Sequence, residues 1–178
     1  MHGRCKEHNK HLCGSTNYDI IKKIKQALDI PVIANGGLAK FSDVQKCMEL
    51  TGVDGVMACE SILEYPAFFD GDKTHDLDDL TLEYIDCFEK YPGEADMKTI
   101  RSHMFKFLYT GLSVHTDLRE RLGRSKTVEE LREVALELKE RRKDEPPESK
   151  ITWYYRHFKG MGLARETTPT YSLEPWDE

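Results

Sequence analysis

Residues 30–37 read IPVIANGG and residues 52–60 read GVDGVMACE, and these two stretches decide the fold. The apolar run over 30–34 has the length of a strand, and continuous runs of this kind are typical of a parallel strand that is buried on both faces. Residues 55–58 predict a second short strand. The turn Asn35-Gly36-Gly37 follows the first strand at once, and its glycines leave the backbone unobstructed by side chains.

Helical patterns surround both predicted strands. Residues 18–28 place Ile20, Ile21, Ile24 and Leu28 on one stripe. Ser42 is expected to cap a helix that ends before Gly52, and a further helix is expected over 61–69. This alternation specifies an α/β fold in which helices cover a parallel sheet through right-handed crossovers. Two parallel strands cannot close a barrel, so we expect the chain to be completed by another or to be a piece of something larger.

The pattern changes after residue 70. Residues 71–79 are acidic and poor in apolar side chains, which predicts a linker. Apolar residues then recur at helical spacing over 80–91, 97–112 and 127–143. Because each apolar stripe needs a partner, a compact bundle of three or four short helices is expected. The remaining tail is basic and aromatic around Trp153 and then turns polar and acidic.

The composition excludes several classes of protein. The 178 residues carry a formal net charge of −6, with acidic residues concentrated in 51–100 and basic residues more frequent in 101–160. No window approaches about 18 consecutive apolar residues, which excludes a membrane-spanning helix, and the N-terminal residues lack the apolar core of a secretory signal. Five scattered cysteines favour a reduced, intracellular protein, and Cys47 and Cys87, which fall on apolar helix faces, are expected in the core.

The strongest local signal for ligand binding is the pair of turns that follow the two strands. The backbone N–H groups of Asn35, Gly36 and Gly37 can converge on an anion, and the turn through Cys59 and Glu60 lies at the same end of the sheet. In eight-stranded α/β barrels such turns frequently form a phosphate site. The alternative is a helix-entry turn without a ligand, and spacing alone does not separate the two.

Other polar residues leave further alternatives open. His2 could donate to a bound ring or phosphate and Arg4 could pair with a phosphate, or both could be solvated at the chain terminus. Arg101, Lys106 and neighbouring cations could bind RNA, or they could be ordinary outer-face charges. The cysteines and histidines near residues 5–13 lack the spacing of a zinc site, so no metal is expected.

An ordered set of motifs makes the chain resemble the tRNA-dihydrouridine synthases. The motifs are HGRCKEH at the start, then an amphipathic helix, IPVIANGG, TGVDGVMACESIL and YPAFF, and the likeness continues more loosely through IRSHMFKFLYTGL and HTDLRERL. The likeness is strongest to the eukaryotic cytoplasmic members that act on D-loop uridines. It implies an FMN-bound eight-stranded TIM barrel, NADPH as reductant, a helical domain that holds tRNA, and a cytoplasmic or nuclear place of action.

The resemblance also implies roles for individual residues. His2 would end the sixth strand near the flavin, while Asn35, Gly36, Gly37, Cys59 and Glu60 would bind the flavin phosphate. Many family members have an arginine where this chain has Glu60, so the resemblance implies backbone contact there. Arg4, Arg101 and Lys106 are assigned to tRNA. Hydride would pass from the reduced flavin to uracil C6, and a cysteine acid would protonate C5 after the base has left its stacked position.

That cysteine motif lies upstream of His2 in the family, so no catalytic residue is expected in this chain. We expect residues 1–70 to form the last part of the barrel, 71–79 a linker, 80–145 the tRNA-binding helices and 146–178 a partly disordered tail. The missing N-terminal half of the barrel would come from the same gene or from a separate chain. The competing hypotheses are an RNA-binding remnant without catalysis and another flavin-binding or phosphate-binding barrel.

Overall fold

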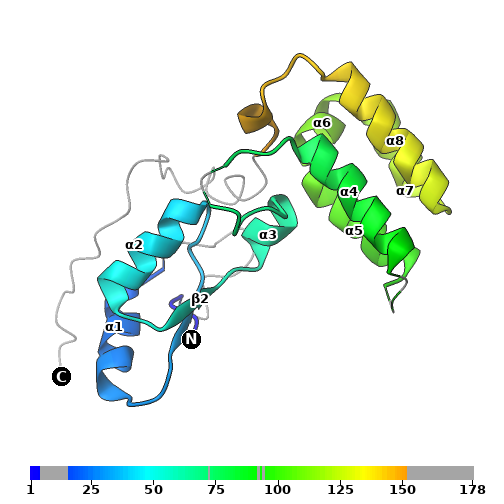
Figure 1. Ribbon diagram of the computed structural model, residues 1–178. Helices are drawn as coiled ribbons and strands as arrows, with labels where there is room; N and C mark the ends of the chain where they lie inside the picture. The colour runs from blue at the N-terminus through cyan, green and yellow to red at the C-terminus, as the bar shows by residue number, and fades with distance from the viewer. Residues whose placement is uncertain (5–15, 72, 92, 94, 152–178) are drawn as a thin grey trace. The chain divides into compact units, whose positions relative to one another are not determined.

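The computed structural model describes residues 1–4, 16–71, 73–91, 93 and 95–151, and these form two compact units (Figure 1). The first unit runs from Met1 to Ala58, and the second begins at Cys59. The change of sequence pattern had predicted this boundary at residue 70. The predictions for Cys5, Cys13 and the tail over 152–178 lie outside the described residues. None of the described helices is long and apolar enough to span a membrane.

The first unit is a small α/β layer built on parallel strands. Strand β1 (Ile33–Asn35) pairs in parallel with β2 (Gly55–Met57), with Asn35 opposite Met57. Helices α1 (Tyr18–Ala27) and α2 (Phe41–Thr51) lie side by side along the strands (Figure 1). The apolar side chains that this layer buries are Ile21, Val32, Ala34, Leu38, Val44, Cys47 and Val53. The α/β class is therefore confirmed for this part of the chain.

Strand β1 begins later than the apolar run predicted. Pro31 has no backbone N–H, and Val32 bonds to Asp54 instead: its N–H donates to the Asp54 carboxylate at 2.7 Å and its carbonyl accepts from Asp54 N–H at 3.0 Å. Ile30 is 63% exposed and Ile33 42% exposed. The prediction of a strand that is buried on both faces was therefore wrong at Ile30 and Ile33.

Two details of the helices also differ. The N-cap of α2 is Lys40, because Asp43 accepts hydrogen bonds from the N–H groups of Ala39 and Lys40 at 2.9 and 3.0 Å. Ser42 lies inside the helix and is not the cap. On α1 Ile21 is fully buried, whereas Ile20 and Leu28 are each 42% exposed, so the predicted stripe is only partly covered.

The second unit is helical. After α3 (Glu60–Glu64) come α4 (Leu77–Lys90), α5 (Met97–Phe107), α6 (Tyr109–Val114), α7 (Thr116–Arg124), α8 (Val128–Arg141) and a 3₁₀ turn, η2 (Pro147–Lys150). Helices α4 and α8 pack against each other, and α5 packs against α4, α6 and α7 (Figure 1). Their shared core includes Ile85, Ile100, Met104 and Leu131, all fully buried.

Three predictions about this unit need correction. Helix α3 ends at Glu64 instead of near residue 69, because Pro66 disfavours the helical conformation of Tyr65, which is extended. The acidic stretch predicted as a linker contains the start of α4, where Asp76 is the N-cap and its carboxylate accepts from Asp78 N–H at 2.8 Å. Cys87 was expected in the core and is exposed.

The helix predicted over 97–112 is two helices that meet at Leu108, and α7 follows directly. The break brings Thr110 to the end of α8, where its hydroxyl accepts from the Arg142 guanidinium at 3.1 Å and donates to the Lys150 carbonyl at 3.0 Å. Gly111 lies against the same guanidinium, since a Cβ atom on it would be 2.7 Å from Arg142 Nη1. A continuous helix would lose this arrangement.

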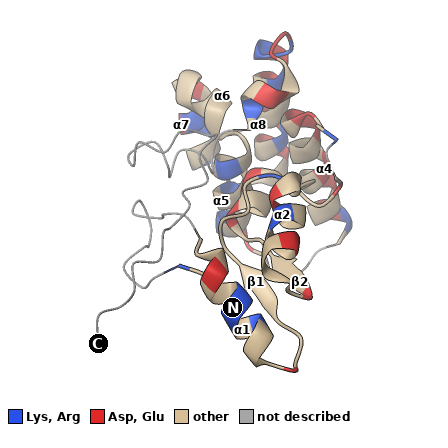
Figure 2. Ribbon diagram, turned by 90° about the vertical axis from the view of Figure 1, so that its left-hand side faces the viewer, with Lys and Arg blue, Asp and Glu red and all other residues tan. Residues whose placement is uncertain are grey.

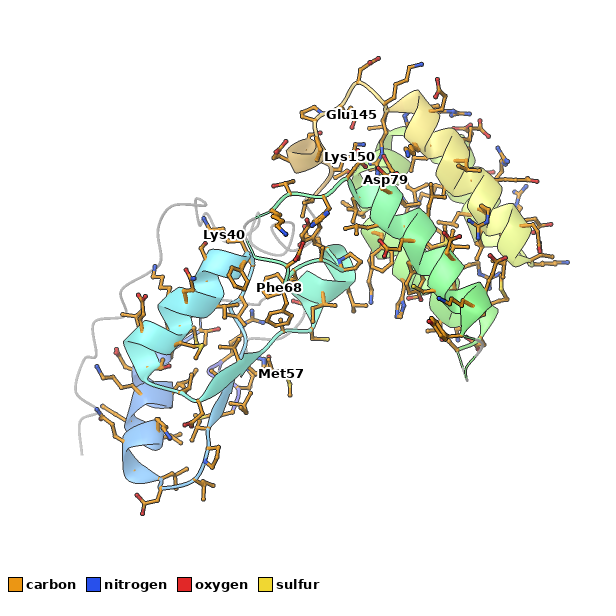
Figure 3. The ribbon with its side chains drawn as sticks, in the orientation of Figure 1. Lys40, Met57, Phe68, Asp79, Glu145 and Lys150 are labelled. Atoms are coloured by element: carbon orange, nitrogen blue, oxygen red, sulfur yellow. The ribbon has the colours of Figure 1, made fainter. Side chains whose placement is uncertain are left out.

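A buried ionic cluster joins the start of α4 to the segment after α8. Asp78, Arg142 and Lys150 have side chains that are 0–1% exposed. Arg142 Nε donates to both carboxylate oxygens of Asp78 at 3.0 and 2.9 Å, and Lys150 Nζ donates to Asp78 at 2.8 Å and to Asp76 at 2.6 Å. Figure 3 shows Lys150 beside the start of α4. Two cations and two carboxylates balance each other there.

The protonation states agree with this geometry. Burial alone would raise the pKa of the Asp76 carboxyl, but hydrogen bonds from Lys150 and from Asp78 N–H hold that pKa below its usual value. Burial alone would lower the pKa of the Lys150 ammonium, but its bonds to Asp76 and Asp78 raise that pKa above its usual value. Both groups are therefore charged at neutral pH.

We expect Asp78→Ala to lower the free energy of unfolding of the helical unit by about 3–5 kcal/mol, because it leaves two buried cations without their shared carboxylate. Urea denaturation followed by circular dichroism measures this. Asp117→Ala is the control, since Asp117 pairs with Arg141 at an exposed position and its loss should have little effect. Equal effects of the two substitutions would contradict the buried cluster.

Candidate functional site

The candidate site is built where short parallel segments end side by side. Asn35 N–H donates to the Met1 carbonyl at 2.8 Å, Gly3 N–H donates to the Asn35 carbonyl at 3.3 Å, and His2 forms a parallel bridge with Asn35. On its other side β1 has Met57 opposite Asn35. Residues 1–3 therefore act as a third parallel segment, and the carboxyl ends of all three lie at one edge. This places His2 beside the turn that follows β1.

The turn after β1 depends on two glycines in the left-handed region. Gly36 has φ +99° and Gly37 has φ +75°. A Cβ atom on Gly36 would lie 2.9 Å from Cε1 of His2, and one on Gly37 would lie 2.5 Å from Oγ1 of Thr16. Among the described residues neither glycine N–H donates to a backbone carbonyl. The turn is thus tightly packed where a Cβ atom would lie, and its two glycine N–H groups have no backbone acceptor among the described residues.

A hydrogen bond to the ring favours one tautomer of His2. Arg4 N–H donates to His2 Nδ1 at 3.3 Å, and a ring nitrogen that accepts a hydrogen bond carries no proton. In the neutral ring the proton is then on Nε2, so Nε2 is the donating atom. An imidazole N–H next to the glycine turn is suited to a phosphate oxygen or to a polar atom of a planar ring.

Asn35 keeps its side chain out of the strand pairing. Its backbone N–H and carbonyl are both used by the Met1–Gly3 segment. The side-chain amide contacts the Met57 sulfur at 3.7 Å, which is a weak interaction that orients the carboxamide across the two strands. A carboxamide at this edge offers a donor and an acceptor of its own to a ligand.

The other two residues predicted for this site begin the second unit. Cys59 is exposed and is the N-cap of α3, but its side chain makes no capping hydrogen bond. Glu60 is the first residue of that helix. Ala58, the last residue of the first unit, is joined to Cys59 by a peptide bond, so the chain leaves β2 at the edge where Asn35 lies. A carboxylate at Glu60 adds no attraction for an anion, which leaves the backbone as the group that could hold one.

The predicted RNA-contacting residues Arg101 and Lys106 lie on α5, and both are half-buried. The Arg101 guanidinium donates to the Ser125 carbonyl at 2.5 Å, so it also fastens α5 to the residue that follows α7. Lys106 takes part in none of the ion pairs among the described residues. The third predicted contact, Arg4, is half-buried in the first unit beside His2.

Helix α5 differs in charge from the other long helices. Its residues MKTIRSHMFKF include Lys98, Arg101 and Lys106 and no acid, whereas α8 has five glutamates and its three cations all form ion pairs (Figure 2). His103 adds no charge at neutral pH: burial and the nearby Lys106 lower its pKa, and its Nδ1 lies 2.7 Å from the Tyr84 hydroxyl. The positive charge of α5 therefore comes from its lysines and Arg101.

One residue beside the glycine turn, Thr16, was not predicted from the sequence. A threonine just before a helix is usually interpreted as part of the helix cap. In this chain the N-cap of α1 is the next residue, Asn17, whose side chain accepts a hydrogen bond from Ile20 N–H at 3.0 Å. Only the folded chain brings Thr16 against Gly37, a contact between residues far apart in sequence. No local pattern signals it.

Comparisons with known proteins point to one family. The family of dihydrouridine synthases (Dus) matches residues 1–144. The chain is 37% identical over 139 residues, 78% of its length, to a tRNA-dihydrouridine(16/17) synthase-like protein of Mus musculus and to one of Rattus norvegicus. It is 30% identical over 138 residues to the tRNA-dihydrouridine(16/17) synthase of Schizosaccharomyces pombe. The matched region covers 29%, 31% and 35% of these relatives, about a third of each.

We expect Gly37→Ala to destabilise the chain more than Gly52→Ala. Both residues have similar φ, +75° and +71°, so both substitutions cost about 1 kcal/mol of backbone strain. A Cβ on Gly37 would also displace Thr16, whereas a Cβ on Gly52 meets nothing within 4 Å. The difference in free energy of unfolding should be about 1 kcal/mol or more, measured by urea denaturation. Equal losses would mean that the turn is not packed in this way.

Proposed function

We propose that this chain, which belongs to the dihydrouridine synthase family, carries the cofactor-phosphate site and the RNA-binding helices of an enzyme that reduces uridine to dihydrouridine in the tRNA D-loop. The observation that carries the proposal is the parallel arrangement of residues 1–3, β1 and β2, which gathers His2, Asn35 and the Gly36-Gly37 turn at one edge. This is the edge at which α/β barrels bind their ligands. The matched region is only part of each relative, so the activity is proposed for the whole enzyme.

The proposed cofactor is FMN, with NADPH as reductant. The residues present fit a phosphate: the turn offers two backbone N–H groups without backbone acceptors, and His2 adds a ring N–H. We assign the phosphate to His2, Gly36 and Gly37, with the Asn35 carboxamide beside them, and the resemblance adds the backbone of Cys59 and Glu60. When bound, FMN supplies the hydride that passes to uracil C6. The residues of this chain orient the cofactor and do not supply the proton for C5.

We propose that further strands of the same barrel complete the sheet. Ile33 and Met57, one on each described strand, are 42% and 54% exposed, and each strand has three residues. A parallel sheet this small leaves its outer edges unpaired, and exposed apolar side chains on its strands are suited to packing inside a larger barrel. The proposed domain plan keeps a partial barrel followed by RNA-binding helices, in an enzyme acting in the cytoplasm or nucleus.

The proposed tRNA contacts are Arg101, Lys106 and Arg4, and the charge pattern adds Lys98. Phosphate binding gains most from cations that have no acidic partner, since an ion-paired cation must first lose that partner. Among the described residues the cations of α5 form no ion pair, although Lys98 lies near enough to the N-cap Asp96 to help lower the pKa of its carboxyl, whereas the cations of α8 are all ion-paired. We therefore place the RNA-facing surface of the helical unit on α5.

We expect the double substitution Lys98→Ala and Lys106→Ala to weaken tRNA binding and to reduce the slope of log K against log salt by about 1.5, because each phosphate contact contributes about 0.7–0.9. Fluorescence anisotropy with labelled tRNA at several salt concentrations measures both quantities. The double substitution Lys139→Ala and Lys143→Ala is the matched control, since Lys139 is paired with Asp79 and Lys143 with Glu140. An equal effect of the control would mean that net charge, and not the α5 surface, governs binding.

We expect the 178-residue chain, incubated with tRNA, FMN and NADPH, to form no dihydrouridine, because the resemblance places the proton-donating cysteine outside it. Mass spectrometry of the digested tRNA detects dihydrouridine directly, and a full-length family member provides the positive control. Product formation by this chain alone would overturn the assignment of the proton donor. Salt-dependent tRNA binding without any flavin binding would favour a non-catalytic RNA-binding protein instead.

A further inference from the structure

The hydroxyl of Thr16 is buried and has no hydrogen-bond partner in the part of the chain that the structure describes. The residue is 9% exposed, and among the described residues nothing forms a hydrogen bond with its Oγ1. Other buried threonines differ: the Thr51 hydroxyl donates to the Cys47 carbonyl at 2.6 Å and the Thr81 hydroxyl to the Leu77 carbonyl at 2.7 Å. A buried hydroxyl without a partner lowers stability, so its retention needs a reason.

The position of Thr16 directs this hydroxyl at the glycine turn. Its methyl group faces Gly3, where a Cβ would lie 2.5 Å from Cγ2, while Oγ1 faces the turn at 2.5 and 3.2 Å from the Cβ positions of Gly37 and Gly36. The next residue is anchored too, because Asn17 N–H donates to the Gly3 carbonyl at 2.8 Å. Steric contact on both sides therefore fixes which branch of the side chain meets the turn.

Donors gather at this point. The hydroxyl proton of Thr16 and the N–H groups of Gly36 and Gly37 all lack a backbone acceptor among the described residues, and the His2 ring is in contact range of the same turn. A group of donors is satisfied by a ligand that has several acceptor oxygens, and a phosphate monoester has three on one face. A neutral ligand with one acceptor would leave most of them unused.

We propose that Thr16 is a further phosphate ligand of this site and that its hydroxyl donates to a terminal oxygen of the flavin phosphate. The proposal rests on the proposed function for the identity of the flavin, but the requirement for an anion follows from the donors alone. The resemblance assigns no role to this position. The hydroxyl without a hydrogen-bond partner then lowers the stability of the ligand-free state, and ligand binding removes this loss.

The test compares Thr16→Val with Thr16→Ser in the full chain. Valine keeps the shape of threonine and removes the hydroxyl, whereas serine keeps the hydroxyl. Binding of FMN, riboflavin and inorganic phosphate is followed by the ¹⁵N–¹H signals of Gly36 and Gly37. We expect Thr16→Val to weaken FMN and phosphate binding about tenfold and to leave riboflavin binding unchanged, because riboflavin has no phosphate. Thr16→Ser should bind like the parent chain.

A second readout separates a ligand role from a structural one. Without ligand, Thr16→Val should unfold at the same or a higher temperature than the parent chain, because it removes an unsatisfied buried hydroxyl. A lower unfolding temperature would show that the hydroxyl has a protein partner, and would overturn the proposal. Unchanged FMN affinity of Thr16→Val would also overturn it while leaving the proposed function intact.

The remaining outcomes are equally decisive. If the parent chain binds phosphate in a Thr16-dependent way but shows no preference for FMN over inorganic phosphate, the assignment of Thr16 stands and the flavin assignment of the proposed function fails. If the parent chain binds neither FMN nor phosphate at the glycine turn, the anion site is wrong and the proposal is overturned.

Discussion

The candidate site depends on the pairing of a single strand residue, Asn35, with segments on both sides of it. Its backbone N–H and carbonyl hold residues 1–3, and its position in β1 lies opposite Met57. A shift of either pairing by one residue would send alternate side chains to the other face of the sheet. His2 would then leave the Gly36-Gly37 turn. The strand register therefore determines which side chains lie beside the turn and so which groups can contact a ligand there.

Much of this architecture could be predicted from local sequence, because glycine and proline impose local constraints. The Asn35-Gly36-Gly37 turn and the end of α2 at Gly52 follow from positive φ, which glycine adopts without strain. The features that could not be predicted depend on contacts between distant residues. Asp78 belongs to an acidic stretch that resembles a linker, and only its pairing with Arg142 and Lys150 makes it a buried part of a helix. Thr16 likewise becomes part of the site only through Gly37.

The net charge of the chain is a poor guide to whether it binds RNA. The formal charge of −6 would argue against RNA, yet the acidic and basic residues are distributed unequally among the helices. On α8 the cations form ion pairs with neighbouring acidic side chains, whereas the residues of α5 include no Asp or Glu. Because salt screens charges over about 8–10 Å, an RNA phosphate near α5 responds to that helix far more than to the total. Ion pairing within the helical unit thus selects the surface that remains available for RNA.

The two units hold their residues in place by different means, and this bears on where function can vary. The helical unit has a continuous core of fully buried side chains and an ionic cluster that closes α4 onto the segment after α8. The sheet unit has strands of three residues, with exposed side chains at Ile33 and Met57. Local opening is favoured where buried apolar contacts are few. The donors at the glycine turn therefore belong to the less stable unit, and a bound anion that joins Thr16, Gly36 and Gly37 would add to that unit the long-range contacts that its short strands do not provide.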